Sequence, residues 1–153
     1  MTFVRRISLA LVLAGFFSLS GCGDSGSGLP VSGLIVSNAT PSSANGTYAL
    51  TVVTSNTVAG ITQVKIADPS NAGRSLQVFY NASLALTSVV YTSPESPVSL
   101  MTCVVGGVLG GVTSACPAAA IFFDLPGKKI TFTNATFTQL TIGVGTLNGT
   151  VSW

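Results

Sequence analysis

The chain has 153 residues, of which 47% are hydrophobic and only 7% are charged, and it contains no histidine. Without an imidazole, catalysis by a Ser-His-Asp triad or a Cys-His pair is excluded. The few basic residues cannot neutralise a row of phosphates, so we expect no nucleic-acid partner.

The first predicted element is a short apolar segment behind a basic start. Arg5 and Arg6 precede the uncharged run Ile7–Leu19. A helix that spans a membrane needs about 20 apolar residues, and this run is shorter. A basic start, a short apolar core and small residues at its end are typical of a cleaved secretory signal.

That segment ends in the tetrapeptide Leu19, Ser20, Gly21 and Cys22. The tetrapeptide resembles the lipobox of bacterial lipoproteins, which reads Leu, a small residue, Gly or Ala, then Cys. The resemblance covers residues 1–22 alone. It implies that the signal peptidase recognises Leu19, Ser20 and Gly21, that cleavage removes residues 1–21, and that Cys22 carries the lipid. Two or more acyl chains give stable anchoring, so the membrane is an expected partner.

Residues 22–28 then form the lipidated cysteine and a flexible Gly/Ser tether. In lipoproteins, Asp directly after the lipidated Cys resembles an inner-membrane retention signal. Here Gly23 takes that position and Asp24 follows. We therefore expect a lipid-anchored protein of a bacterial cell envelope. The outer membrane, on its periplasmic face or at the cell surface, is favoured over the inner membrane.

Residues 29–153 are expected to form a single all-β domain. They are rich in Val, Ile, Thr, Phe and Tyr, and Gly, Pro, Asn and Ser interrupt them at short intervals. This pattern predicts about nine or ten short strands in one β-sandwich, or in a small barrel-like domain. Beyond the signal segment, no sustained helical period is present.

Alternation predicts which side chains share a face in two of the earlier strands. It places Tyr48, Leu50 and Val52 on one face of a strand, and Leu76, Val78 and Tyr80 on one face of another.

The end of the chain is predicted to hold two short strands on either side of Asn134, followed by a last strand at 146–153. The Asn-Gly dipeptide within 146–153 would make that segment a hairpin if it forms a turn. As a single strand, the segment places Leu147, Val151 and Trp153 toward the core.

Two cysteines remain once Cys22 is lipidated, and they are Cys103 and Cys116. An even pair in an oxidising compartment predicts a disulfide. Closing that loop is expected to stabilise the domain by about 3 kcal/mol. Two thiolates alone cannot complete a zinc site, so we expect neither a metal nor another cofactor.

Three acidic residues follow the tether, namely Asp68, Glu95 and Asp124, each in a segment that contains proline. Acidic residues in such segments commonly cap turns. A carboxylate pair can still hydrolyse a glycoside, so an envelope enzyme or enzyme accessory that uses these residues stays an alternative. Convergence of two of them in one cleft would favour it.

A second alternative is a small outer-membrane β-barrel, which the terminal aromatic residue Trp153 suggests. Our main expectation is different: a lipid-anchored envelope protein that is not an enzyme and whose β-domain has a binding or structural role. Its ligand would be an envelope protein or a glycan, which the sequence leaves unspecified.

Overall fold

Two antiparallel five-stranded sheets pack face to face in the residues that the computed structural model describes, which are 33–95, 99–105, 115–138 and 144–153. In order across the first sheet lie β2 (Gly46–Ala49), β1 (Gly33–Ser37), β10 (Val144–Ser152), β9 (Lys129–Thr138) and β8 (Ile121–Asp124). Across the second sheet lie β3 (Val52–Val58), β4 (Ile61–Asp68), β5 (Asn71–Asn81), β6 (Leu86–Ser93) and β7 (Ser99–Val104). Two short 3-10 turns, η1 (Ser42–Ala44) and η2 (Ala118–Ala120), complete the described elements. The predicted all-β sandwich of short strands is confirmed.

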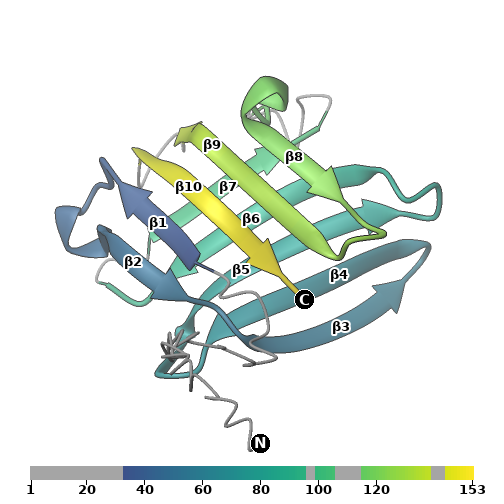
Figure 1. Cartoon of the computed structure of the whole chain (residues 1–153), viewed down its shortest axis with the longest axis horizontal. Coiled ribbons are helices and arrows are strands. Elements are labelled where there is room, and N and C mark those ends of the chain that lie inside the picture. Colours follow the sequence, from purple (N-terminus) through teal and green to yellow (C-terminus); the bar gives the residue numbers. More distant parts are fainter. Residues whose placement is uncertain (1–32, 96–98, 106–114, 139–143) are drawn as a thin grey trace, which may run out of the picture.

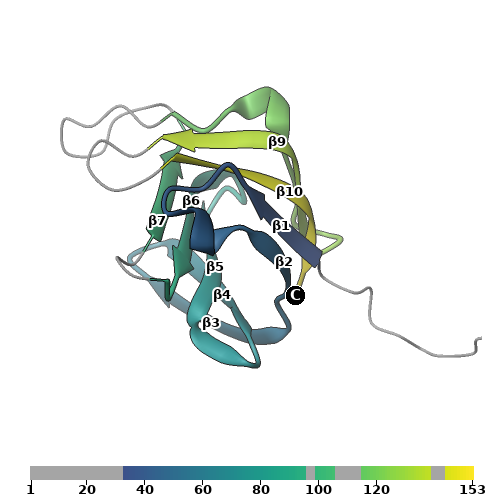
Figure 2. The ribbon, with the colours of Figure 1, turned by 90° about the vertical axis from the view of Figure 1, so that its left-hand side faces the viewer.

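The hydrophobic core lies between the two sheets, which Figure 2 shows from the side. Successive residues of a strand point to opposite faces, so alternate positions fill this space. In β5, Leu76 and Val78 are fully buried and Tyr80 is partly buried, which confirms the predicted face. The largest fully buried side chains include Tyr91, Phe132 and Phe137.

The chain changes sheets after β2, and the shared face predicted for Tyr48, Leu50 and Val52 was therefore wrong. Strand β2 belongs to the first sheet and β3 to the second. Leu50 lies in the crossing and is fully buried, whereas Val52 is 48% exposed. Alternation defines a face only within one continuous strand, and the crossing between layers interrupts it.

Strand β9 is one continuous strand, although two strands around Asn134 were predicted. Asn134 adopts a left-handed φ of 50°, and Gly149 in β10, which pairs with Phe132, has a φ of 106°. The register of the two strands shifts between Leu147 and Gly149, which is a β-bulge. The Asn-Gly dipeptide lies at this bulge and does not form a turn, so β10 is a single strand and not a hairpin.

The last residue, Trp153, covers one end of the core and is partly exposed. Its ring stacks on Phe123 with 6.1 Å between ring centroids, and Phe123 in turn lies 5.9 Å from Tyr80. Leu147 and Val151 are fully buried, as the core-facing side of β10 requires. The prediction therefore holds for these two residues, and Trp153 packs against the margin of the core.

Candidate functional site

The predicted lipid-attachment site lies outside the described residues. This applies to Cys22, to the recognition residues Leu19, Ser20 and Gly21, and to the tether at 22–28. Within the part of the chain that the structure describes, no helix is long and apolar enough to span a membrane.

The second predicted pair, Cys103 and Cys116, lies at disulfide-bonding distance, with 2.09 Å between the sulfur atoms and 4.6 Å between the Cα atoms. Cys103 is buried near the end of β7. The backbone N–H of Cys116 donates to the carbonyl oxygen of Val104 at 3.1 Å, and Ala115 forms a parallel bridge to Val104. The pair therefore holds the segment at 115–116 against the end of β7.

Two of the three predicted acids converge on one basic residue that the sequence analysis did not single out, Arg74 of β5. Its Nη1 atom lies 2.9 Å from Asp68 Oδ2, and its Nη2 atom donates to Glu95 Oε1. The guanidinium also lies over the ring of Tyr48, with its central carbon 3.8 Å from the ring centroid. We call these four residues, Tyr48, Asp68, Arg74 and Glu95, the Arg74 cluster.

Turn chemistry brings the Arg74 cluster together. Asp68 ends β4 and accepts hydrogen bonds from the backbone N–H of Ser70 at 2.8 Å and from its hydroxyl at 2.5 Å. Such a side-chain turn returns the chain sharply into β5, which places Arg74 beside Asp68. Glu95 follows the end of β6, the next strand in the sheet.

The hydroxyl of Ser70 is the main cause of a lowered pKa for Asp68; burial opposes the shift, and Arg74 lowers the pKa further. Burial alone would lower the pKa of Arg74, but Asp68 and Glu95 raise it. Asp68 and Arg74 therefore stay charged at neutral pH, and their interaction is largely desolvated.

Arg74 Nε and Glu95 Oε2 are buried and have no hydrogen-bond partner among the described residues. Residues 96–98, which follow Glu95, are not among these. The convergence that the enzyme alternative requires is thus present for Asp68 and Glu95, but both carboxylates bind the same guanidinium. The arrangement is that of a buried ion-pair network.

The third acid, Asp124, lies apart from the other two, at the end of β8 in the first sheet. It accepts a hydrogen bond from the N–H of Gly127 at 3.0 Å and lies 3.4 Å from Lys129 Nζ. The Gly127 bond, with a contribution from Lys129, lowers the pKa of Asp124. Asp124 therefore organises the turn between β8 and β9, as acids in such segments commonly do.

The most accessible element is strand β3, in which all seven residues are exposed. It runs along the margin of the second sheet, beyond the strands of the first (Figure 1). One of its edges pairs with β4, and no described residue pairs with the other. Three of its side chains are large, apolar and exposed: Val52, Val53 and Val58.

A tight turn joins β3 to β4, so the two strands form a β-hairpin. Ala59 and Gly60 have φ values of 50° and 78°, and the two positive values indicate a type I′ turn. The register with β4 is unbroken from Val52 to Val58. A shallow depression at this hairpin is lined by the residues Thr54, Ser55, Asn56, Gln63 and Lys65.

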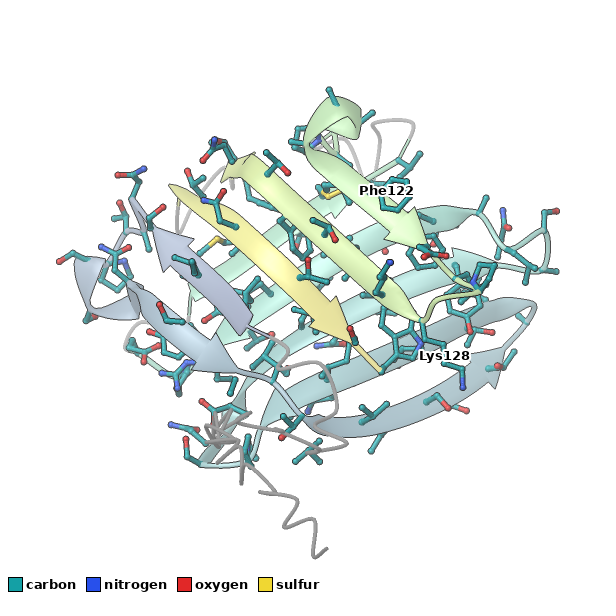
Figure 3. All side chains as sticks on the ribbon, viewed as in Figure 1. Phe122 and Lys128 are labelled. Atoms are coloured by element: carbon teal, nitrogen blue, oxygen red, sulfur yellow. A yellow bond between two sulfur atoms is a disulfide. The ribbon has the colours of Figure 1, made fainter. Side chains whose placement is uncertain are left out.

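The other sheet margins are shorter or covered. Strands β2 and β8 have four residues each. The end of β7 is bonded to the segment at 115–116. Figure 3 shows Phe122 on β8 and Lys128 in the turn that follows, and Phe122 is a single exposed aromatic on that short edge. Among the described strands, β3 is therefore the long open edge.

Comparison with known protein families, with curated proteins and with solved structures finds no match to this chain. The assignment of a function consequently rests on the chain's own residues and geometry.

Proposed function

We propose that the chain is a lipid-anchored protein of a bacterial cell envelope whose β-sandwich binds another protein through the open edge of β3. The lipobox at 19–22 supports the anchor. The two packed sheets support a rigid domain, and the Gly/Ser-rich sequence at 22–28 supports a short tether. The role is binding and not catalysis.

The observation that carries the binding role is the lack of protection along β3. An edge strand exposes a row of unpaired N–H and C=O groups, which is a template for another strand. Soluble proteins usually protect such edges with a charge, a proline, a bulge or a very short strand. Strand β3 reads VVTSNTV, has an unbroken register and contains none of these devices.

The state of the acidic residues supports a role without catalysis. A general acid or base must reach a substrate with a free oxygen. Asp68 and Glu95 both bind Arg74, the remaining Glu95 oxygen, Oε2, is buried, and Asp124 binds Gly127 and Lys129. We therefore place function on the exposed strand and not on the carboxylates.

The anchor is tested by metabolic labelling with a fatty-acid probe. The Cys22→Ala chain should lose the label, since it has no thiol to accept the diacylglycerol. The matched control is Ser20→Ala, which keeps a small residue at that lipobox position and should be labelled normally. Normal labelling of Cys22→Ala would disprove the anchor.

The binding edge is tested with a photo-activated cross-linking residue in the lipidated protein within its native envelope. Position 55, on β3, should give a protein adduct. Position 133 is the matched control, because Thr133 is also exposed but lies on β9, between β8 and β10. If position 55 gives no protein adduct, or none beyond that at position 133, the binding role of β3 is wrong.

A further inference from the structure

We infer that the strand bound by β3 is the β3 strand of a second copy of this chain, in an antiparallel two-fold pairing centred on Ser55. This inference rests on the proposed role of β3 as a binding edge and adds the identity of the partner and the register.

The hairpin fixes which backbone groups of β3 point to the open edge. Val58 and Ile61 flank the two-residue turn, so they form a hydrogen-bonded pair with each other. Along an antiparallel ladder, hydrogen-bonded pairs alternate with non-hydrogen-bonded pairs. The N–H and C=O groups of Val53, Ser55 and Thr57 are therefore directed away from β4. Ser55 is the middle residue of both this outward-facing set and the strand.

The residues of β3 are complementary to their own sequence when it is reversed about Ser55. In a two-fold pairing, Ser55 faces itself, and each remaining residue faces one of similar character. The facing pairs are Val52 with Val58, Val53 with Thr57, and Thr54 with Asn56. Each pair occurs twice in a two-fold arrangement, which is the defining property of an isologous interface. No charged residue lies in the strand, so the pairing places no like charges opposite each other.

The pairing would also extend the core-facing side of the second sheet from one copy into the other. Val53 and Ser55 pair with Ile66 and Val64 of β4, which are both buried. Val53 and Ser55 therefore lie on the core-facing side of the second sheet. Val53 is 43% exposed there, because the second sheet extends beyond the strands of the first sheet at this margin. A second β3 would place Thr57 beside Val53 on that same side.

The proposed anchor favours a second copy over a soluble partner. Past the signal segment, the basic residues Lys65, Arg74, Lys128 and Lys129 are balanced by the acids Asp24, Asp68, Glu95 and Asp124. Two copies therefore carry no net charge that would drive them apart. Chains tethered to one membrane also meet at a high effective concentration, which allows a small strand-to-strand contact to form.

The test is disulfide trapping of the full, lipidated chain in its envelope under oxidising conditions. A hydrogen-bonded antiparallel pair has about 5.5 Å between Cα atoms, which is within the reach of a disulfide. The Ser55→Cys chain should therefore form a covalent dimer of twice the chain mass. The matched control is Thr57→Cys, because the two copies of position 57 lie about 13 Å apart along the strand in this register. It should stay monomeric.

A second measurement checks the register without relying on one position. Val53→Cys and Thr57→Cys chains carrying different tags, when expressed together, should give the mixed dimer, because positions 53 and 57 face each other. Each chain expressed alone should not dimerise. Equal dimer yields at 53, 55 and 57 would overturn the proposed register.

The outcomes separate this inference from the proposed function. If photo-cross-linking at position 55 captures a different protein and Ser55→Cys forms no dimer, self-pairing is wrong although β3 still binds. If position 55 gives no adduct of any kind, both are wrong. An adduct of twice the chain mass together with the Ser55→Cys dimer supports both.

Discussion

The Arg74 cluster and strand β3 differ in almost every physical respect, although both lie in one domain. Arg74 is 9% exposed and is surrounded by two carboxylates and an aromatic ring, whereas every residue of β3 is exposed and its outer backbone groups have no partner among the described residues. The cluster holds charged side chains that form ion pairs and a cation-π contact. Strand β3 holds only uncharged side chains.

The difference shows where an interaction with another molecule can occur. Strongly charged side chains that bind one another inside the fold stabilise it and are unavailable to a ligand. A plain strand of Val, Thr, Ser and Asn offers its backbone, whose hydrogen-bonding groups are strong in any sequence. In this domain, then, substitutions in the cluster should change stability, and substitutions in β3 should change association.

The largest effect is expected for Arg74→Ala, which leaves Asp68 and Glu95 buried without their common partner. Removing one side of a buried ion pair costs about 3–5 kcal/mol of unfolding free energy. Chemical denaturation of the purified protein measures it. The control is Lys128→Ala, an exposed lysine whose loss should change stability by less than about 0.5 kcal/mol. Equal denaturation midpoints for the two variants would show that the cluster is not structural.

An intermediate effect is expected for Trp153→Ala, because this ring covers the core only partly. Loss of its buried area and of its stacking on Phe123 should cost about 2 kcal/mol. Phe132→Ala is the comparison, since Phe132 is 2% exposed and its removal should cost about 3–5 kcal/mol. Thermal unfolding should rank Phe132→Ala as the less stable. The reverse order would place Trp153 at the centre of the core.

A smaller effect on the free energy of unfolding is expected when the pH is lowered. The pKa of Asp68 is lowered in the folded protein, first by the hydroxyl of Ser70 and also by Arg74, against the effect of burial. A carboxyl group of this kind contributes stability above its unfolded pKa, near 3.9, and that contribution is lost as pH falls through the lower folded value.

The Asp68→Asn variant should therefore be less stable than the wild type at pH 7, and the difference should shrink below about pH 4. Denaturation midpoints measured from pH 7 to pH 2 follow this change. Ser70→Ala should show the same trend in weaker form, because Arg74 still binds the carboxylate. A difference that stays constant across this range would contradict the assignment.

The smallest effect on stability is expected for Ser55→Pro. Proline has no N–H, but the N–H of Ser55 points away from β4, so the internal ladder keeps its bonds. The free energy of unfolding should change by about 0.5 kcal/mol or less. Association should be lost in sedimentation of the solubilised protein, because the central bond of the proposed pairing cannot form.

The neighbouring position supplies the control for that substitution. The N–H of Asn56 points toward β4 in the same register, so Asn56→Pro removes a bond within the sheet and should cost about 1–3 kcal/mol. If Ser55→Pro destabilises the domain as much as Asn56→Pro, the assignment of outward-facing groups is wrong.

The sequence was sufficient to predict the class of fold and the faces within single strands. Leu76 and Val78 alternate within β5 and are buried as expected, because a period of two residues is a local property. The pairing of Cys103 with Cys116 followed from their number and the expected compartment. It is also the arrangement that the structure contains.

Features that depend on contacts between distant segments could not be predicted. Val52 left the predicted face because the chain crosses between layers at Leu50. Glu95 meets Arg74 from 21 residues away, and nothing in the local sequence of either residue indicates this contact. The open edge of β3 was also missed, since an edge is defined by the order of strands in a sheet.

The segment bonded to β7 sets a limit on how far such a sheet can grow. An assembly that lengthens indefinitely, as a fibril does, needs two free edges on every copy. Here the margin opposite β3 carries Ala115 bridged to Val104, with Cys116 at disulfide-bonding distance from Cys103. Two copies joined through β3 would therefore present β7 at both ends, and the segment at 115–116 is bonded to the last residue of each β7 strand. The cysteine pair keeps that segment beside the end of β7, where it opposes the addition of a further strand and favours an assembly of two chains.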